Sequence, residues 1–147
     1  DALRQARRVL TDDGVLVAAL WAEPERVAYH TLPRQLLAQH RTPPPRDPDA
    51  PGAFRFADPE RTARDFASAG LRIEHSEEMH VDVFEARTVA EVVEWLRPLG
   101  LEPLLRDLPD AAVRQWEQDL GEALAHDRTD GMLRLGGITR LVVARRS

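Results

Sequence analysis

The order of apolar and polar positions predicts helices and strands that alternate along the chain. Apolar residues recur at helical spacing over 2–10, which predicts an amphipathic helix. The run 15–21 is apolar without alternation, and this predicts a strand buried on both faces of a parallel sheet. Between them, Gly14 is suited to the left-handed position that ends a helix. A helix that leads into a buried strand is the repeating unit of α/β proteins.

The middle of the chain combines a proline-rich stretch with a well-marked helix and a long strand. Residues 22–57 are expected to be mostly irregular, apart from a short helix over 32–40. Asp58-Pro59 predicts a helix start, because a capping side chain precedes a proline at the first helical position. Gly70 should end that helix. We expect it to bury Ala63, Phe66, Ala67 and Ala69. The alternation over 71–85 then predicts a strand, with one face made by Leu71, Ile73, Met79, Val81 and Val83.

The last third of the chain predicts a helical insert, at about 88–130, before a final strand. Thr88 and Glu91 have the spacing of a capping box, and Pro109-Asp110 restarts a helix. The face of this second helix is Val113, Trp116, Leu120 and Leu124. We expect a turn over 127–131, a strand over 132–135, a hairpin turn at Gly136-Gly137 and a strand over 138–144.

Composition narrows the classes of protein and of partner. The 147 residues suit a single α/β domain, 1–147. The net charge of -5 without clustered positive charge argues against a nucleic-acid partner. No apolar run approaches the roughly 18 residues of a membrane span, and no signal peptide is visible, so we expect no membrane partner and a cytoplasmic location. The absence of cysteine excludes disulfides and thiolate metal sites.

The predicted element order resembles the C-terminal, substrate-side half of the class I S-adenosylmethionine-dependent methyltransferases, in the branch that acts on small molecules. The first stretch that carries the likeness is ALRQARRVLTDDGVLV, residues 2–17, where the family has a helix ending in arginine, valine and leucine, then a turn and an apolar strand. Asp12-Asp13 replaces the proline and glycine usual in that turn. The second stretch, FASAGLRIE at 66–74, resembles the junction into strand six, and 138–146 resembles strand seven.

The resemblance implies a Rossmann-like fold in which strand seven returns antiparallel between strands five and six. It also implies S-adenosylmethionine as the cofactor of the complete protein and a small-molecule methyl acceptor as its partner. The family binds the cofactor through a glycine-rich turn between a strand and a helix, which this chain lacks. We therefore expect no cofactor-binding residues and no cofactor for this chain alone. The chain also begins at Asp1, inside an expected helix, so we expect a piece of a longer protein.

Three candidate site residues lie at or after the first strand. Trp21 follows the strand, at the edge where α/β sheets bind ligands, and either lines a substrate pocket or caps the core. Tyr29 and His30 fall in the loop beyond it. His30 is the candidate catalytic base for an acceptor that loses a proton, because the pKa of histidine lies near operating pH. The alternative is a solvated loop histidine.

Two further groups of residues have a functional and a structural interpretation. Four aromatic residues either line an apolar substrate pocket, which is the functional interpretation, or simply pack in the core. This group consists of Phe54, Phe56, Phe84 and Trp95, of which Phe56 and Trp95 join Trp21 and Tyr29 as candidate pocket residues. His75, Glu77 and His80 have metal-ligand chemistry, but on a strand His80 points opposite to the other two, so we expect no metal site.

Two hypotheses about function follow from the sequence. The first is the substrate-side part of a methyltransferase, with the insert and the 22–57 loop covering the acceptor. The second is a non-catalytic module that binds an apolar ligand or a partner protein. Half of a sheet exposes a strand edge, which favours association, so a homo-oligomer formed through that edge is also an expectation.

Overall fold

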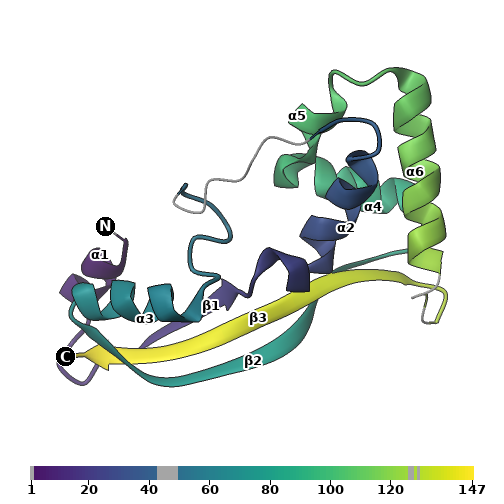
Figure 1. Ribbon diagram of the computed structural model, residues 1–147. Coiled ribbons are helices and arrows are strands. Elements are labelled where there is room, and N and C mark those ends of the chain that lie inside the picture. The colour runs from purple at the N-terminus through teal and green to yellow at the C-terminus, as the bar shows by residue number, and fades with distance from the viewer. Residues whose placement is uncertain (1, 43–49, 126–127, 129) are drawn as a thin grey trace. The chain divides into compact units, whose positions relative to one another are not determined.

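The computed structural model describes residues 2–42, 50–125, 128 and 130–147. Its sheet is three-stranded and antiparallel, with β3 (Leu133–Arg146) between β1 (Leu16–Trp21) and β2 (Leu71–Ala86) (Figure 1). The helical elements are α1 (Ala2–Val9), η1 (Pro24–Arg26), α2 (Ala28–Leu37), α3 (Pro59–Ser68), α4 (Val89–Leu96), η2 (Arg97–Leu101), α5 (Glu102–Leu105) and α6 (Asp110–Ala125). The chain is therefore a mixed α/β protein, as the sequence predicts. No helix among the described residues has the length and apolar character needed to cross a membrane.

The chain divides into two compact units. The first consists of Asp1–Arg26, Asp47–Val81 and Ile138–Ser147, and the second of Val27–Arg46 and Asp82–Gly137. The long strands β2 and β3 contribute residues to both. Helices α1 and α3 belong to the first unit, and helices α2, α4, α5 and α6 belong to the second.

The pairing of β1 with β3 confirms the expected antiparallel arrangement of these two segments. The register runs from Leu16 opposite Ala144 to Trp21 opposite Thr139. Beyond the strand end, the Ala22 N–H donates to the Ile138 carbonyl at 3.0 Å. The first unit therefore has β3 as its central strand.

Helices α1 and α3 supply the core of the first unit. The buried residues Phe66 and Leu71 pack with Val142 and Ala144 of β3. The partly buried apolar residues against this cluster are Leu3, Leu10, Leu16, Ala18, Leu20 and Ile73. Because Leu16, Ala18 and Leu20 alternate along β1, one face of this strand meets the core.

The opposite face of β1 is open, which contradicts the expectation of a strand buried on both sides. Val17 is 57% exposed and Val15 is 41% exposed. The physical reason is that the described helices of the first unit contribute to a core on one side of β1 only. The strand also lies at one edge of the sheet formed by the described residues.

The predicted start of α3 is confirmed, while its buried stripe is partly wrong. Asp58 caps the helix by accepting hydrogen bonds from the N–H groups of Glu60 and Arg61 at 2.8 and 3.1 Å. Ala63 and Ala67 are exposed. Thr62 is buried in their place, because its hydroxyl donates to the Phe56 carbonyl at 2.9 Å and so satisfies its own polar group.

The two glycine turns of the first unit differ from each other. Gly70 ends α3 with a φ of 73°, as predicted. Gly14 does not have a positive φ, so the left-handed prediction for it is wrong. A Cβ at Gly14 would lie 2.9 Å from the Thr11 carbonyl oxygen, and the position therefore needs glycine for space.

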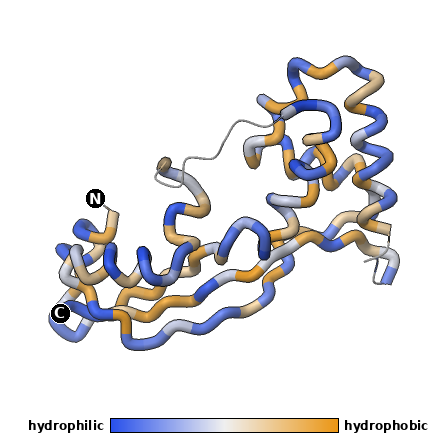
Figure 2. The backbone as a smooth tube through the Cα atoms, in the orientation of Figure 1, coloured by the Kyte–Doolittle hydropathy of each residue, from blue (hydrophilic) through white to orange (hydrophobic). Residues whose placement is uncertain are grey.

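In the second unit, α6 buries the stripe that its periodicity predicts. Trp116, Leu120 and Leu124 are buried, and apolar and polar positions alternate along the helix in Figure 2. The Trp116 indole N–H donates to the Pro33 carbonyl at 2.9 Å, which joins α6 to α2. Helix α2 begins at Ala28, earlier than the expected start at residue 32. Residues 43–49 of the proline-rich stretch lie outside the described residues.

The capping box at α4 is confirmed, with one change. The Thr88 side chain accepts from the Glu91 N–H at 3.3 Å. The Glu91 carboxylate accepts from the Arg87 N–H at 2.8 Å, one residue before the expected donor. Residues 127 and 129 of the expected turn lie outside the described residues, whereas Asp130 and Gly131 have positive φ angles of 52° and 77°.

Burial along β2 does not follow the single face that the alternation predicts. Leu71 and Ile73 face the core of the first unit, but Met79 is 42% exposed. At the other end of the strand the buried residues are Phe84 and Ala86. This shift occurs because the two ends of the 16-residue strand belong to different units, each with its own packing.

The predicted hairpin at Gly136-Gly137 is also wrong, because both residues lie inside the continuous strand β3. A Cβ at Gly137 would lie 2.7 Å from Val27 Cα and 2.8 Å from Val27 Cγ1. This glycine therefore permits the close approach of another backbone, which is an established use of glycine inside strands.

We predict that Gly137→Ala lowers the free energy of unfolding by about 1–3 kcal/mol, the usual cost of forcing a methyl group into a filled space. Gly52→Ala is the matched control, because a Cβ there meets no atom within 4 Å. Urea denaturation of both variants provides the measurement. Equal stability of the two variants would contradict the close approach at Gly137.

Candidate functional site

A cluster of four charged side chains gathers around the end of β1 in the first unit. Arg140 of β3 is only 5% exposed. Its Nη1 donates to the Ala57 carbonyl at 3.1 Å, and its Nη2 donates to Glu78 Oε1 of β2 at 3.1 Å. Glu23, which follows β1, places Oε1 3.8 Å from Arg140 Nη2. Burying a guanidinium is costly unless it is paired, and these contacts supply the pairing.

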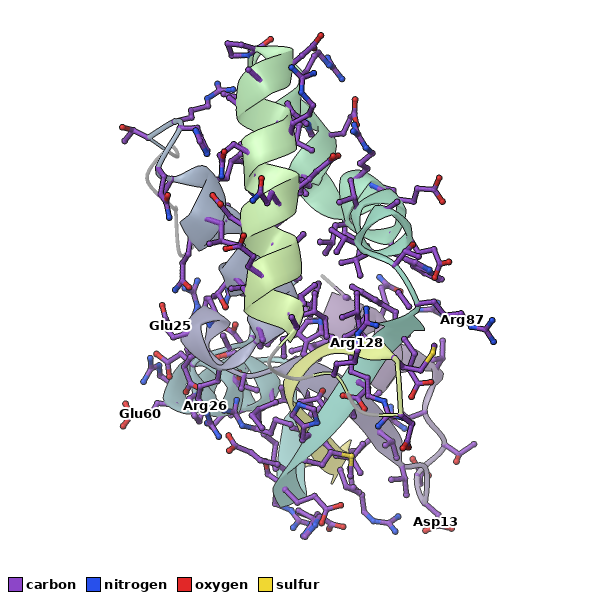
Figure 3. All side chains as sticks on the ribbon, turned by 90° about the vertical axis from the view of Figure 1, so that its right-hand side faces the viewer. Asp13, Glu25, Arg26, Glu60, Arg87 and Arg128 are labelled. Carbon is purple, nitrogen blue, oxygen red and sulfur yellow. The ribbon has the colours of Figure 1, made fainter. Side chains whose placement is uncertain are left out.

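Arg26 completes the cluster from η1. Its two terminal nitrogens donate to the two carboxylate oxygens of Glu78, at 3.1 and 2.6 Å, which is a bidentate pair. Arg26 also pairs with Glu23 at 3.3 Å. Figure 3 labels Arg26.

The hydrogen bonds to Glu78 shift its pKa. The hydrogen bond from Arg26 is the largest cause that lowers the pKa of the Glu78 carboxyl below its ordinary value, and the hydrogen bond from Arg140 is the second. The same bond raises the pKa of Arg26, with the hydrogen bond to Glu78 as the largest cause. The cluster holds the segment after β1 against β2 and β3 through its hydrogen bonds and ion pairs. It is not predictable from local patterns, because Glu78 and Arg140 are 62 positions apart.

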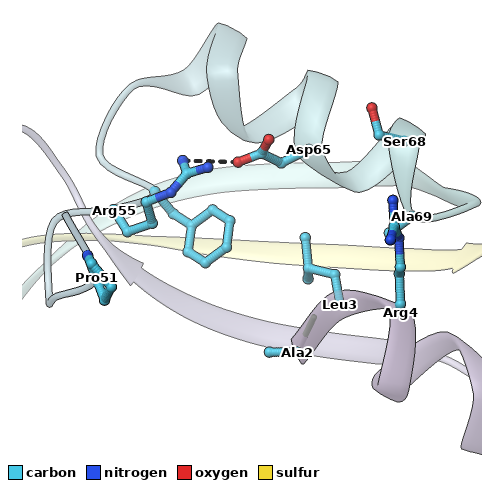
Figure 4. A pocket seen from close by; sticks show the side chains of 9 residues that line it. Ala2, Leu3, Arg4, Pro51, Arg55, Asp65, Ser68 and Ala69 are labelled. Carbon is cyan, nitrogen blue, oxygen red and sulfur yellow. Dashed lines mark ion pairs between the residues drawn. The ribbon is translucent and has the colours of Figure 1, made fainter. Parts of the chain in front are cut away.

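The second feature of the first unit is a cavity of about 500 Å³ between α1, α3 and the segment before α3 (Figure 4). Its polar lining residues are Arg4, Arg55, Asp65 and Ser68, and its apolar ones are Ala2, Leu3, Pro51, Phe56 and Ala69. Of the candidate pocket residues, Phe56 lies in this lining. A volume of this size accommodates a small organic molecule.

An ion pair forms one wall of the cavity. Arg55 Nη1 lies 2.9 Å from Asp65 Oδ2, as the dashed line in Figure 4 shows. The Arg55 guanidinium also lies 5.6 Å from the centre of the Phe56 ring, within the range of a cation–π contact. Phe56 meets Phe66 edge to face, with 6.4 Å between the ring centres. Phe56 is therefore held by contacts on two sides, and it presents apolar surface to the cavity.

Tyr29 and His30 lie on helix α2 of the second unit, and not in a loop as expected. Tyr29 is 8% exposed, and burial raises the pKa of its hydroxyl. The ring of His30 meets that of Tyr29 edge to face at 6.4 Å between centres. Arg34 Nη1 donates to the His30 carbonyl at 3.0 Å. The structure thus brings Tyr29 and His30 together on one helical turn, while the role of His30 as a base stays a prediction.

The two candidate tryptophans belong to different units. Trp21 is half-buried at the last residue of β1, in the predicted place. Trp95 is 56% exposed on α4 and stacks on the buried ring of Phe84, with the ring centres 6.0 Å apart and the planes at 5°. That stacking contact supports packing as part of the role of Phe84. The proposed lining role of Trp95 stays a prediction.

His75 and Glu77 share a face of β2, as the strand period predicts. His75 Nε2 lies 3.4 Å from Glu77 Oε2, and both side chains are exposed. Within the described parts of the chain, no group of three or more histidine, aspartate or glutamate residues is arranged to hold a metal ion.

Comparison with known proteins identifies no family or function for these sites. No model of a protein family matches the sequence, and no curated protein matches it either. The class of the protein is therefore argued from its fold and from the sites above.

We predict that Glu78→Gln lowers the free energy of unfolding at pH 7 by about 1–2 kcal/mol, because the buried Arg140 loses the nearer of its two carboxylate partners. The folded pKa of Glu78 is depressed, so its contribution is present above the ordinary value of 4.5 and is lost as the pH falls through the folded pKa. The difference between wild type and variant should therefore shrink below pH 4.5.

The matched control is Glu94→Gln on α4, where the glutamate is exposed and takes no part in this cluster. This change should shift stability by less than about 0.5 kcal/mol. Thermal unfolding of the three proteins between pH 3 and 7 measures the effect, with the range chosen to bracket the carboxyl titration at roughly pH 4. A difference between wild type and Glu78→Gln that stays constant with pH would contradict the assigned pKa shift.

Proposed function

We propose that this chain is the substrate-side part of an S-adenosylmethionine-dependent methyltransferase that acts on a small molecule. One observation carries the proposal: the last strand, β3, runs antiparallel to β1 and lies between β1 and β2. In the methyltransferases that the sequence resembles, strand seven occupies this position between strands five and six. If the strands simply followed their order along the chain, β2 would lie beside β1. The position of β3 between them therefore distinguishes this topology from a simple sequential sheet.

The connections between the strands support the same assignment. Helix α1 leads into β1, α3 leads into β2, and the helices α4 to α6 stand between β2 and β3. This is the order of helices and strands in the C-terminal half of a Rossmann-like methyltransferase, with a helical insert before the final strand. The insert was expected at about 88–130, and α4 to α6 cover Val89–Ala125.

The open side of β1 is consistent with a missing neighbour. Val15 and Val17 of this segment, and Val9 at the end of α1, are exposed by 41%, 57% and 66%. The parallel sheets of α/β proteins are covered on both faces, whereas an antiparallel sheet can leave one face to water. The exposed side chains here are apolar, however, and clustered apolar surface is seldom left to water. An upstream half-sheet with its own helices would cover these valines in the complete protein.

The residues of this chain do not fit the methyl donor. A glycine-rich turn that leads from a strand into a helix is needed to let backbone approach such a ligand. Gly14 precedes β1 and follows a helix, and Gly136 and Gly137 lie inside β3. Cofactor binding is therefore assigned to the part of the protein outside residues 1–147, and this chain is assigned the methyl acceptor.

The acceptor side has suitable chemistry in the first unit. Phe56 contributes an aromatic surface to the cavity, and Trp21 stands at the end of β1, where ligands of α/β sheets bind. Methyl transfer depends mainly on positioning, which fixed aromatic surfaces provide. The candidate base, His30, belongs to the second unit, and its role for an acceptor that loses a proton stays a prediction.

The alternative is a non-catalytic module that associates through its sheet edge. The exposed valines beside the open edge of β1 favour it, because such an edge can pair with a partner strand or with a second copy of the chain. The two functions are distinguished by cofactor binding in the complete gene product.

We predict that the complete gene product binds S-adenosylmethionine with micromolar affinity and that residues 1–147 alone give no measurable binding. Isothermal titration calorimetry measures both proteins. In the complete product, Trp21→Ala should leave the cofactor affinity within about twofold, because an acceptor-side residue makes no cofactor contact. Absence of binding by the complete product would refute the methyltransferase proposal and favour the module.

A further inference from the structure

A second cavity lies in the second unit, where α5 ends and α6 begins. Its volume is about 300 Å³, at the lower end of the range for sites that bind small molecules. Arg97, Arg106 and Arg114 line it together with Asp110. Three arginines and a single aspartate give this cavity a positive charge on a chain whose net charge is -5. The cavity therefore differs in charge from the chain as a whole.

Two of the three guanidinium groups are available to a ligand. Arg97 Nη1 is held by Glu102 Oε2 at 2.7 Å. Within residues 2–42, 50–125, 128 and 130–147, the side chains of Arg106 and Arg114 form no hydrogen bond or ion pair. Both residues are exposed, so an anion can reach them from solvent. Two unpartnered guanidinium charges match a dianion better than a single negative charge.

The backbone beside the arginines adds to the positive potential. The cavity includes Asp110, the first residue of the 16-residue helix α6. The positive end of the helix dipole therefore lies at the cavity and favours a negative ligand.

The rest of the lining is apolar. Leu105 is 4% exposed, and Val113 is partly buried on α6. These side chains line the cavity with apolar surface, while arginine recognises the oxygens of a phosphate by paired hydrogen bonds. The lining thus combines an oxyanion site with an apolar wall.

We infer that this cavity binds a small organic phosphate, with the phosphate on Arg106 and Arg114 and the apolar body against Leu105 and Val113. The inference does not depend on the proposed methyltransferase function, because it rests on a different unit and on different residues. It assigns the helical insert a ligand of its own.

Phosphate binding is tested by titrating the isotope-labelled chain with inorganic phosphate, phenyl phosphate and benzoate and recording amide NMR spectra. Phenyl phosphate should shift the amides of 97 and of 105–114, and it should bind at least threefold more tightly than either of the other two. Raised salt should weaken the binding, as for an exposed ionic contact. Equal affinity for benzoate and phenyl phosphate would overturn the dianion assignment.

Arg106→Gln and Arg114→Gln should each weaken phenyl phosphate binding at least threefold, and the double variant at least tenfold. Arg87→Gln is the matched control: Arg87 is an exposed arginine of the same unit whose side chain points away from the ribbon in Figure 3, and it does not line the cavity. Each single variant is first checked by thermal unfolding. If Arg87→Gln weakens binding as much as the other two, the binding is diffuse attraction and the inference is wrong.

Discussion

The antiparallel pairing of β3 with β1 determines where the other described elements of the first unit lie. This pairing makes the last strand of the chain the central strand of the sheet. Val142 and Ala144 on one face of β3 then supply the surface on which Phe66 and Leu71 pack. A core built in this way joins residues from both ends of the sequence, so it forms only when the C-terminal strand is in place.

The same pairing imposes an electrostatic constraint. Arg140 stands opposite Leu20 on β1, and its side chain is almost completely buried. A buried guanidinium must be matched by acceptors, and Glu78 provides a carboxylate while Ala57 provides a carbonyl. Arg26 then holds the second oxygen of Glu78. The charged cluster is therefore a consequence of the strand order, and it fixes the segment that follows β1.

Local features of the fold could be predicted from the sequence, and features set by distant contacts could not. The caps at Asp58 and Thr88 depend on residues two or three positions away, and both predictions are confirmed. The prediction that β1 is buried on both faces is wrong. Burial depends on which other elements cover a strand, and the strand's own sequence pattern does not encode them. The Gly136-Gly137 pair between two apolar segments predicts a hairpin turn, and this prediction is wrong because the contact of Gly137 with Val27 joins segments far apart in the chain.

Disulfide formation between Val17→Cys and Val143→Cys tests the strand order most directly, because the chain has no cysteine of its own. Val17 stands opposite Val143. Hydrogen-bonded and non-hydrogen-bonded pairs alternate along antiparallel strands, and Ala22 with Ile138 is a hydrogen-bonded pair. Val17 and Val143 therefore form a non-hydrogen-bonded pair, whose Cα atoms should lie about 4.5 Å apart. We predict that this pair oxidises to an intramolecular disulfide, whereas Val17→Cys with Thr139→Cys does not. Failure of the first pair to cross-link, read by mass spectrometry, would contradict the pairing of β3 with β1, and cross-linking of the second pair in its place would contradict the register.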